Sequence, residues 1–154
     1  MLAGQRHMSG IDTRLGTLLQ GCEVSGPVSA EEIEAAQEAL GLVFPPSYRY
    51  FLAKYGAALG AGFYIAGLSH ESLGPDDTPM WSNVVRDTMR YRPNSLPENS
   101  IAISHDGAEF GYFLCCSRSD SGYEGPVIEW GPAHDGGVEF ASDFVAFVEV
   151  LRRR

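Results

Sequence analysis

The fold is decided around residues 44–56, which read Phe44-Pro45-Pro46-Ser47-Tyr48-Arg49-Tyr50-Phe51-Leu52-Ala53-Lys54-Tyr55-Gly56. Two consecutive prolines fix φ and disfavour the α conformation of the residue before each, so a helix ending near Gly41 cannot continue through them. Pro46 or Ser47 can open a second helix, because a missing N–H costs nothing in its first turn. Its apolar face then recurs at helical spacing through Tyr48, Phe51, Leu52 and Tyr55, before Gly56 ends it. The stretch therefore predicts two helices joined by a fixed elbow.

Including the helix that leads into the elbow, four helical segments are predicted besides the one that begins at Pro46 or Ser47. The first covers 9–19, and the next begins with the capping box Ser29-Ala30-Glu31-Glu32 and leads into the elbow. Another is expected over 81–92, where Pro93 ends it. The last follows Ser142 and carries an apolar stripe formed by Phe144, Phe147, Val148 and Leu151.

The segments between these helices predict strands and loops. A strand is expected over 62–66, and the runs 101–104 and 110–115 flank the turn His105-Asp106-Gly107-Ala108-Glu109 as a β-hairpin. The run 126–130 adds a third strand, and 138–140 a short edge strand. Surface loops are expected over 69–79, 117–125 and 131–137.

The order of these elements predicts an α+β fold. We expect a single domain over 9–154, in which one antiparallel sheet of about four to six strands packs with the N-terminal helices and a C-terminal helix. Residues 1–8 show no periodicity, and we expect them to be disordered or a cloning remnant.

Charge restricts the classes of partner. The chain of 154 residues has 11 basic and 20 acidic side chains, which gives a net charge of −9. This surface would repel a phosphate backbone, so we expect no direct nucleic-acid binding. A basic protein partner would instead be steered towards it, although acidity also serves solubility alone.

The sequence also indicates a cellular location. No apolar run approaches the ~20 residues that span a bilayer, and the first residues lack the pattern of a signal peptide. The odd number of cysteines, Cys22, Cys115 and Cys116, fits reduced thiols. We therefore expect a cytoplasmic protein without membrane association, and its oligomeric state is left open.

Candidate catalytic groups are present without a catalytic motif. His105-Asp106 and His134-Asp135 lie in turns where polar residues are common, and Cys115-Cys116 lacks the spacing of a zinc site. His70, His105 and His134 likewise show no metal-ligand spacing. We expect no catalytic residue, no metal and no cofactor, and we keep a hydrolase that uses His105 or His134 with neighbouring acids as the alternative.

Two groups of aromatic side chains are candidates for binding. Tyr50 lies off the apolar face of its helix and Tyr123 lies in a polar loop, so both are candidate interface anchors. A regulatory small-ligand domain is a further alternative. Its pocket would lie against the sheet and be lined by Tyr48, Trp81, Tyr112 and Trp130.

The succession of motifs over 28–151 resembles the SUKH superfamily, the domain of fungal cell-wall synthesis regulators and of many bacterial immunity proteins. The start of the family pattern is matched by Glu34, Leu40-Gly41, Phe44-Pro45-Pro46-Ser47-Tyr48 and Phe51-Leu52. Its middle is matched by Leu96-Pro97, Ile101-Ala102-Ile103 and Asp106-Gly107 with the strand to Leu114. Its end is matched by Pro126-Val127-Ile128-Glu129-Trp130 and Ala141-Ser142-Asp143-Phe144 with Phe147.

The resemblance implies a non-catalytic immunity protein that neutralises a cognate toxin by occluding it. Toxins of this kind are frequently basic nucleases, which the acidic charge would complement. Acidic and aromatic side chains in the predicted loops would then contact the toxin. These candidates are Asp76, Asp77, Asp106, Glu109, Asp120, Tyr123, Glu124 and Asp135.

Overall fold

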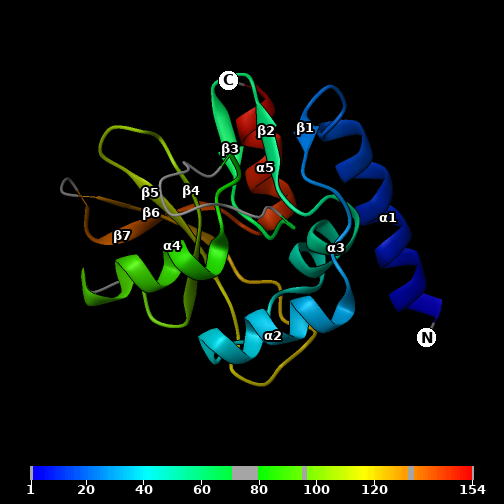
Figure 1. Cartoon of the computed structure of the whole chain (residues 1–154), viewed down its shortest axis with the longest axis horizontal. Coiled ribbons are helices and arrows are strands. Elements are labelled where there is room, and N and C mark those ends of the chain that lie inside the picture. Colours follow the sequence, from blue (N-terminus) through cyan, green and yellow to red (C-terminus); the bar gives the residue numbers. More distant parts are fainter. Residues whose placement is uncertain (1, 71–79, 95–96, 132–133, 154) are drawn as a thin grey trace.

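The structure is a computed structural model that describes residues 2–70, 80–94, 97–131 and 134–153, with the backbone alone at 2–9, 94 and 134–136. The helices are α1 (Leu2–Leu18), α2 (Ala30–Leu40), α3 (Pro46–Lys54), α4 (Val84–Tyr91), the short 3₁₀ helix η1 (Arg92–Asn94) and α5 (Phe144–Arg153). The strands are β1 (Glu23–Val24), β2 (Ala58–Gly60), β3 (Phe63–Ile65), β4 (Ser100–His105), β5 (Gly111–Cys115), β6 (Val127–Gly131) and β7 (His134–Ala141). Figure 1 shows their arrangement, which confirms the α+β fold.

The strands form two antiparallel sheets. One has the order β1-β2-β3, and the other is the meander β4-β5-β6-β7. The predicted hairpin is confirmed by the pairing of Ile101 with Leu114 and of His105 with Gly111. The N–H of Ala66, which follows β3, donates to the carbonyl of Ile103 at 2.8 Å and so links the two sheets.

The elbow has the predicted form. α2 ends at Leu40 and is followed by the cap residue Gly41, whose φ of 70° is a left-handed conformation that glycine adopts without strain. The side chain of Gln37 accepts from the N–H of Phe44 at 2.8 Å, and α3 then begins at Pro46. The two helices are therefore joined at a fixed angle.

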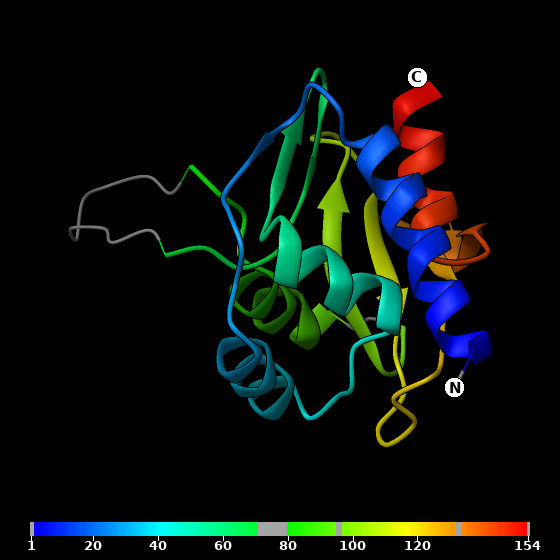
Figure 2. The same ribbon diagram turned by 90° about the vertical axis from the view of Figure 1, so that its right-hand side faces the viewer.

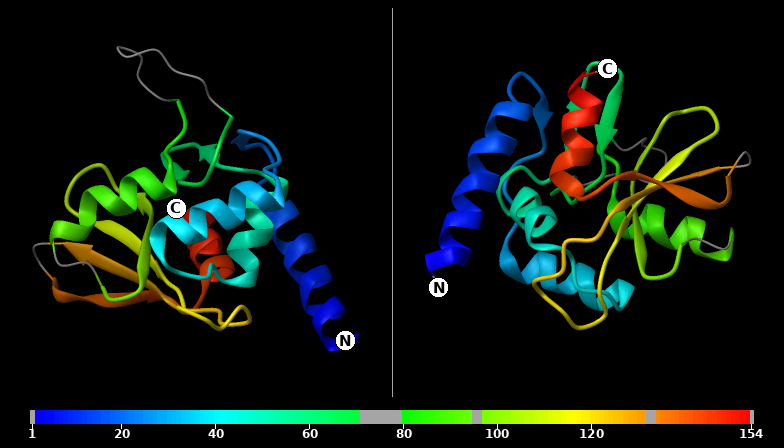
Figure 3. Two further views of the ribbon diagram at one scale, coloured as in Figure 1. Left: turned by 60° about the horizontal axis from the view of Figure 1, so that its bottom comes forward. Right: turned by 180° about the vertical axis from the view of Figure 1, so that it is seen from behind.

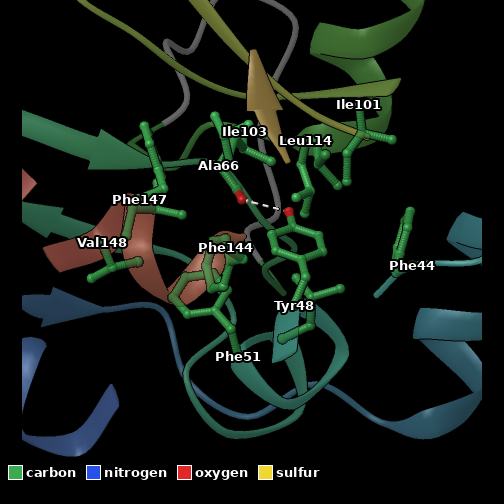
Figure 4. Close-up of a cluster of buried hydrophobic side chains, with 14 of the residues drawn as sticks. Phe44, Tyr48, Phe51, Ala66, Ile101, Ile103, Leu114, Phe144, Phe147 and Val148 are labelled. Carbon is green, nitrogen blue, oxygen red and sulfur yellow. Dashed lines mark hydrogen bonds between the residues drawn. The ribbon is translucent and has the colours of Figure 1, made fainter. Parts of the chain in front are cut away.

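The core gathers around Tyr48 of α3, as Figure 4 shows. Tyr48 is fully buried, and its hydroxyl donates to the carbonyl of Ala66 at 2.6 Å. Its ring meets that of Phe144 of α5 edge to face, with 5.1 Å between centroids. The apolar stripes predicted for α3 and α5 thus pack against each other and against the sheets.

Helices cover both faces of the four-stranded sheet. Tyr112 of β5 contacts Phe147 of α5, whereas the next residue, Phe113, contacts Tyr91 of α4. Successive side chains of a strand point to opposite faces, so α4 and α5 lie on opposite sides. Figure 2 shows this arrangement and places α1 beside α5.

Several predicted boundaries were wrong. α1 begins at Leu2 rather than Ser9, and β1 lies between the first two helices, where no strand was predicted. α4 begins at Val84 rather than Trp81, because the side chain of Asn83 accepts from the N–H of Arg86 at 3.0 Å and caps the helix there. β7 extends back to His134, so it is longer than the predicted edge strand 138–140. Of the predicted loop 69–79, residues 71–79 lie outside the described residues.

Candidate functional site

Glu124 fixes the loop 117–125 to the elbow. Its carboxylate accepts from the N–H of Ser47 at 3.0 Å and from Ser47 Oγ at 2.7 Å. Ser47 lies in the first turn of α3, where backbone N–H groups lack partners within the helix, and Pro45 provides no side-chain cap. A carboxylate is also favoured at the positive end of the helix dipole. Glu124 therefore caps α3 from a distant part of the chain.

Arg49 provides a second attachment for this loop. Its Nε donates to the carbonyl of Phe44 at 2.9 Å, and its Nη2 donates to the carbonyl of Ser121. The loop closes at Gly125, where a Cβ would lie 2.2 Å from the carbonyl oxygen of Cys115. In Figures 1 and 3 the loop, drawn in yellow, lies next to the elbow. The loop is thus held to α3 both by Arg49 and by the bonds between Glu124 and Ser47.

The loop presents an aromatic and an acidic side chain to solvent. Tyr123 is 39% exposed, and Asp120 is also exposed. The carboxylate of Asp120 accepts from the N–H of Gly122 at 2.9 Å, and Ser117 Oγ accepts from the N–H of Asp120 at 2.8 Å. These bonds order the loop internally. The Tyr123 hollow, of about 360 Å³, is lined by Asn99, Cys116, Ser117, Arg118, Ser119, Asp120 and Tyr123.

A larger cavity adjoins the Tyr123 hollow. This Arg118 groove has a volume of about 540 Å³ and shares Arg118 and Asn99 with the hollow. The groove is formed by the C-terminal ends of α2 and α4, the turn before β4, and the start of the loop 117–125. Its lining residues are Leu40, Gly41, Leu42, Arg92, Pro97, Glu98, Asn99, Ser100 and Arg118.

Asn99 organises the wall between the two cavities. Its φ of 55° is left-handed, a conformation that asparagine tolerates better than most residues. Its backbone carbonyl accepts from the N–H of Cys116 at 2.7 Å, and its side-chain Oδ1 accepts from Arg118 Nε at 3.1 Å. Asn99 thereby joins the turn before β4 to the start of the loop 117–125.

The thiol in the hollow does not suit nucleophilic chemistry. Cys116 is 5% exposed, and burial raises the pKa of its thiol well above its usual range. A protonated thiol is a poor nucleophile, since the thiolate is the reactive form. The arrangement of the hollow and the groove therefore suits binding through polar and aromatic contacts.

The predicted contact residues fall at two ends of the four-stranded sheet. Asp120, Tyr123 and Glu124 follow the C-terminal end of β5, and Glu124 is half-buried by its bonds to Ser47. Asp106 and Glu109 lie in the turn before β5, at the opposite end of that strand.

The side chains of three of the predicted acids lie outside the described part of the structure. Asp135 belongs to β7, and its side chain is outside the described part of the structure. Asp76 and Asp77 lie outside the described residues altogether.

The turn at Asp106 is held by its own carboxylate. Asp106 Oδ1 accepts from the N–H groups of Ala108 at 2.8 Å and Phe110 at 3.0 Å. The hydrogen bond from Ala108 is the main reason that the pKa of Asp106 lies below its ordinary value. The carboxylate thus stabilises the predicted Asp106-Gly107 turn.

The residues predicted for a sheet pocket are dispersed. Tyr48 and Tyr112 are buried, and the hydroxyl of Tyr112 donates to Glu129 at 3.0 Å. Trp130 is half-buried and meets Phe113 edge to face, and Trp81 is half-buried before α4. None of the four lines the Arg118 groove or the Tyr123 hollow.

Tyr50, the second predicted anchor, joins two helices. Its hydroxyl donates to the carboxylate of Asp12 in α1, which also accepts from Lys54 Nζ at 2.8 Å. Tyr50 additionally lines a groove of about 590 Å³ between α2 and α3. The hydroxyl of Tyr50 therefore ties α3 to α1, while its half-buried side chain lines this groove.

His105 is engaged within its own turn. Its Nδ1 accepts from the N–H of Gly107 at 2.9 Å, and its ring stacks on Tyr91 with 6.4 Å between centroids. His105 lines neither the Arg118 groove nor the Tyr123 hollow. The side chain of His134 is outside the described part of the structure.

Candidate metal sites and membrane spans are both absent from the described part of the chain. There, no group of three or more His, Cys, Asp or Glu side chains is placed to hold a metal ion. Likewise, none of the helices in that part is long and apolar enough to span a membrane.

From the sequence, Arg92, Asn99 and Arg118 were not identified as parts of one site. The only sequence signals for this site were weak: a Pro97-Glu98-Asn99 turn and two isolated arginines.

A comparison with protein families supports the interpretation of the whole domain. A family model described as "SUKH_5: SMI1-KNR4 cell-wall" matches residues 18–151, from the last residue of α1 into α5.

Proposed function

The chain belongs to the SMI1-KNR4 family of the SUKH superfamily, and on that premise we propose that it is a non-catalytic immunity protein, which neutralises a cognate toxin by covering it. Such a protein needs a surface that is ordered before the partner arrives, because ordering a loop on binding reduces the affinity. The loop 117–125 meets this requirement.

The observation that carries the proposal is the exposure of Tyr123 on a loop that hydrogen bonds attach to α3. Tyrosine is enriched among the residues that dominate binding energy at interfaces. Here its ring is 39% exposed, while the neighbouring Glu124 is bonded to Ser47 of α3. The side chain of Tyr123 is thus presented from a fixed base, beside the carboxylate of Asp120.

Charge supports a basic toxin, such as a nuclease. The net charge of −9 would accelerate association with a cationic protein by long-range attraction. The exposed side of α2 adds Glu31, Glu34 and Glu38 to this field, and the helix has no basic residue. Occlusion by such a surface requires no chemical step, which agrees with the buried thiol and the engaged histidine.

We place the protein in the cytoplasm of the cell that makes the toxin. Its three cysteines are free thiols, as expected in a reducing compartment. In that compartment the protein would protect the producing cell from its own toxin.

The direct test uses the toxin gene next to the gene for this chain. The toxin is expressed in a host cell with and without this protein, and growth is measured. The proposal expects growth only when both are present, and a co-purified complex of the two chains. Death of cells that contain both proteins, with the immunity chain folded and abundant, would refute the proposal for that toxin.

A further inference from the structure

The Arg118 groove concentrates positive charge on an acidic protein. Arg92 and Arg118 both line it, and both are exposed. Three other arginines pair with acids: Arg14 and Arg153 with Glu149, and Arg86 with Asp87. Within the described residues, by contrast, Arg92 and Arg118 form no ion pair, and their hydrogen bonds go to uncharged groups.

The guanidinium of Arg118 is oriented by Asn99. The bond from Nε to Asn99 Oδ1, 3.1 Å long, uses the inner edge of the guanidinium. In the described part of the structure its two terminal Nη groups have no hydrogen-bond partner. The pair of Nη groups forms a planar fork that matches the two oxygens of a carboxylate. Asn99 is therefore a positioning residue for Arg118.

Arg92 is held at the other side of the groove. Its Nη2 donates to the carbonyl of Leu40, the last residue of α2, at 2.7 Å. This bond anchors the side chain at one terminal nitrogen and keeps its charge at the wall of the groove. Two anchored cations thus face one cavity of about 540 Å³.

We propose that Arg92 and Arg118 form a recognition site for a carboxylate of the partner polypeptide. The inference rests on the proposed function and deepens it, because it adds an acidic contact to a partner otherwise attracted by positive charge. The partner would place an aspartate or glutamate side chain, or its terminal carboxylate, in the Arg118 groove. A neighbouring part of the partner would contact Tyr123.

A carboxylate fits better than a phosphate because Glu98 also lines the groove. Its negative charge repels a dianionic phosphate more strongly than a singly charged carboxylate. A polypeptide fits better than a small acid because the groove continues into the Tyr123 hollow through Asn99 and Arg118. A chain that crosses this boundary meets two arginines and then Asp120 with Tyr123.

The site is tested without a toxin, by NMR on the full chain with labelled arginine side chains. The probe is the capped tripeptide Gly-Asp-Gly, and the matched control probe is capped Gly-Asn-Gly. Inorganic phosphate is titrated separately. The proposal expects a saturable shift of the Nε–H resonances of Arg92 and Arg118 with the aspartate peptide, and weaker binding of the asparagine peptide and of phosphate.

Three variants assign the effect to these residues. Arg118→Gln should weaken binding of the aspartate peptide by roughly tenfold, because a charge-assisted bidentate contact is lost. Asn99→Gly keeps the left-handed backbone and removes only the side-chain acceptor, so it should weaken peptide binding without changing the Nε–H resonance of Arg92 in the free protein. Arg90→Gln makes the same charge change on an exposed residue outside the groove and should leave binding unchanged.

Several results of the peptide titration would overturn the proposed carboxylate site. Equal binding of the aspartate and asparagine peptides, or equal effects of Arg118→Gln and Arg90→Gln, would exclude a carboxylate site. Tighter binding of phosphate would assign the groove to a phosphate ligand instead. Failure of toxin neutralisation alone would count against the immunity function, since the peptide titration contains no toxin.

Discussion

Glu124 and Ser47, which are 77 positions apart in the chain, are joined by two hydrogen bonds between the carboxylate of Glu124 and the N–H and Oγ of Ser47. The contact links the element that organises the core to the loop that presents Tyr123. The helix that supplies Tyr48 to the core therefore also fixes the proposed contact surface.

Replacing Glu124 should affect stability and loop order together. Glu124→Ala removes the cap of α3 and is expected to lower the free energy of unfolding by about 2 kcal/mol. Glu124→Gln keeps one acceptor and should cost less. Urea denaturation measures the loss, and hydrogen exchange should show faster exchange in the loop 117–125. The control is Glu109→Ala, which removes an exposed acid from a turn. If Glu124→Ala lowers the free energy of unfolding no more than this control does, the cap contributes nothing to stability.

The buried hydroxyl of Tyr48 should matter more than the half-buried hydroxyl of Tyr50. Tyr48→Phe leaves the carbonyl of Ala66 without its donor in the core, at a cost of about 1 to 3 kcal/mol. Tyr50→Phe removes a bond to Asp12, which keeps Lys54 as a donor near solvent. Urea denaturation of both variants measures the two losses in the free energy of unfolding. Equal losses would contradict the assigned difference in burial.

Asp106 should make stability depend on acidic pH. The hydrogen bond from Ala108 holds the pKa of Asp106 below its ordinary value of 3.8 in the folded protein. A lowered folded pKa gives a stabilisation that is complete above the unfolded pKa and is lost as pH falls through the folded pKa. The difference in free energy of unfolding between wild type and Asp106→Asn should therefore shrink below pH 3.8. A difference that stays constant through that range would be inconsistent with this assignment.

The thiol of Cys116 should resist alkylation in the folded protein. It is buried and its pKa is raised by burial, whereas Cys22 is half-buried. Mass spectrometry after brief treatment with iodoacetamide should find Cys22 modified before Cys116, and the difference should vanish in urea. Preferential labelling of Cys116 would instead indicate a reactive thiol in the Tyr123 hollow.

The elements with a strong period or a specific cap were predictable from the sequence. The capping box at Ser29 is present, with Ser29 Oγ 3.2 Å from the N–H of Glu32. The stripe of α5 and the Asp106-Gly107 turn are also found as expected. β1 and β2 were not predictable, because strands of two or three residues have no detectable alternation and depend on each other for pairing.

The candidate site was only partly predictable. Local sequence placed Tyr123 and Asp120 in an exposed loop, and the structure places both beside one hollow. The Arg118 groove is formed by residues from four separate segments, which only tertiary packing brings together. The role of Glu124 depends equally on Ser47, which is distant in the sequence. The sequence therefore predicted only an acid in a polar loop, whereas the structure shows that Glu124 caps α3.

The measurement that tests the account most directly is the affinity of the purified protein for its toxin, compared between Tyr123→Ala and Val138→Ala. Both remove an exposed apolar side chain, 39% and 45% exposed respectively, and Val138 lies in β7, away from the loop 117–125. The account predicts that Tyr123→Ala weakens binding roughly 30-fold, as for an interface anchor, and that Val138→Ala leaves it within about twofold. Equal affinities of the two variants would contradict the assignment of the loop 117–125 as the contact surface.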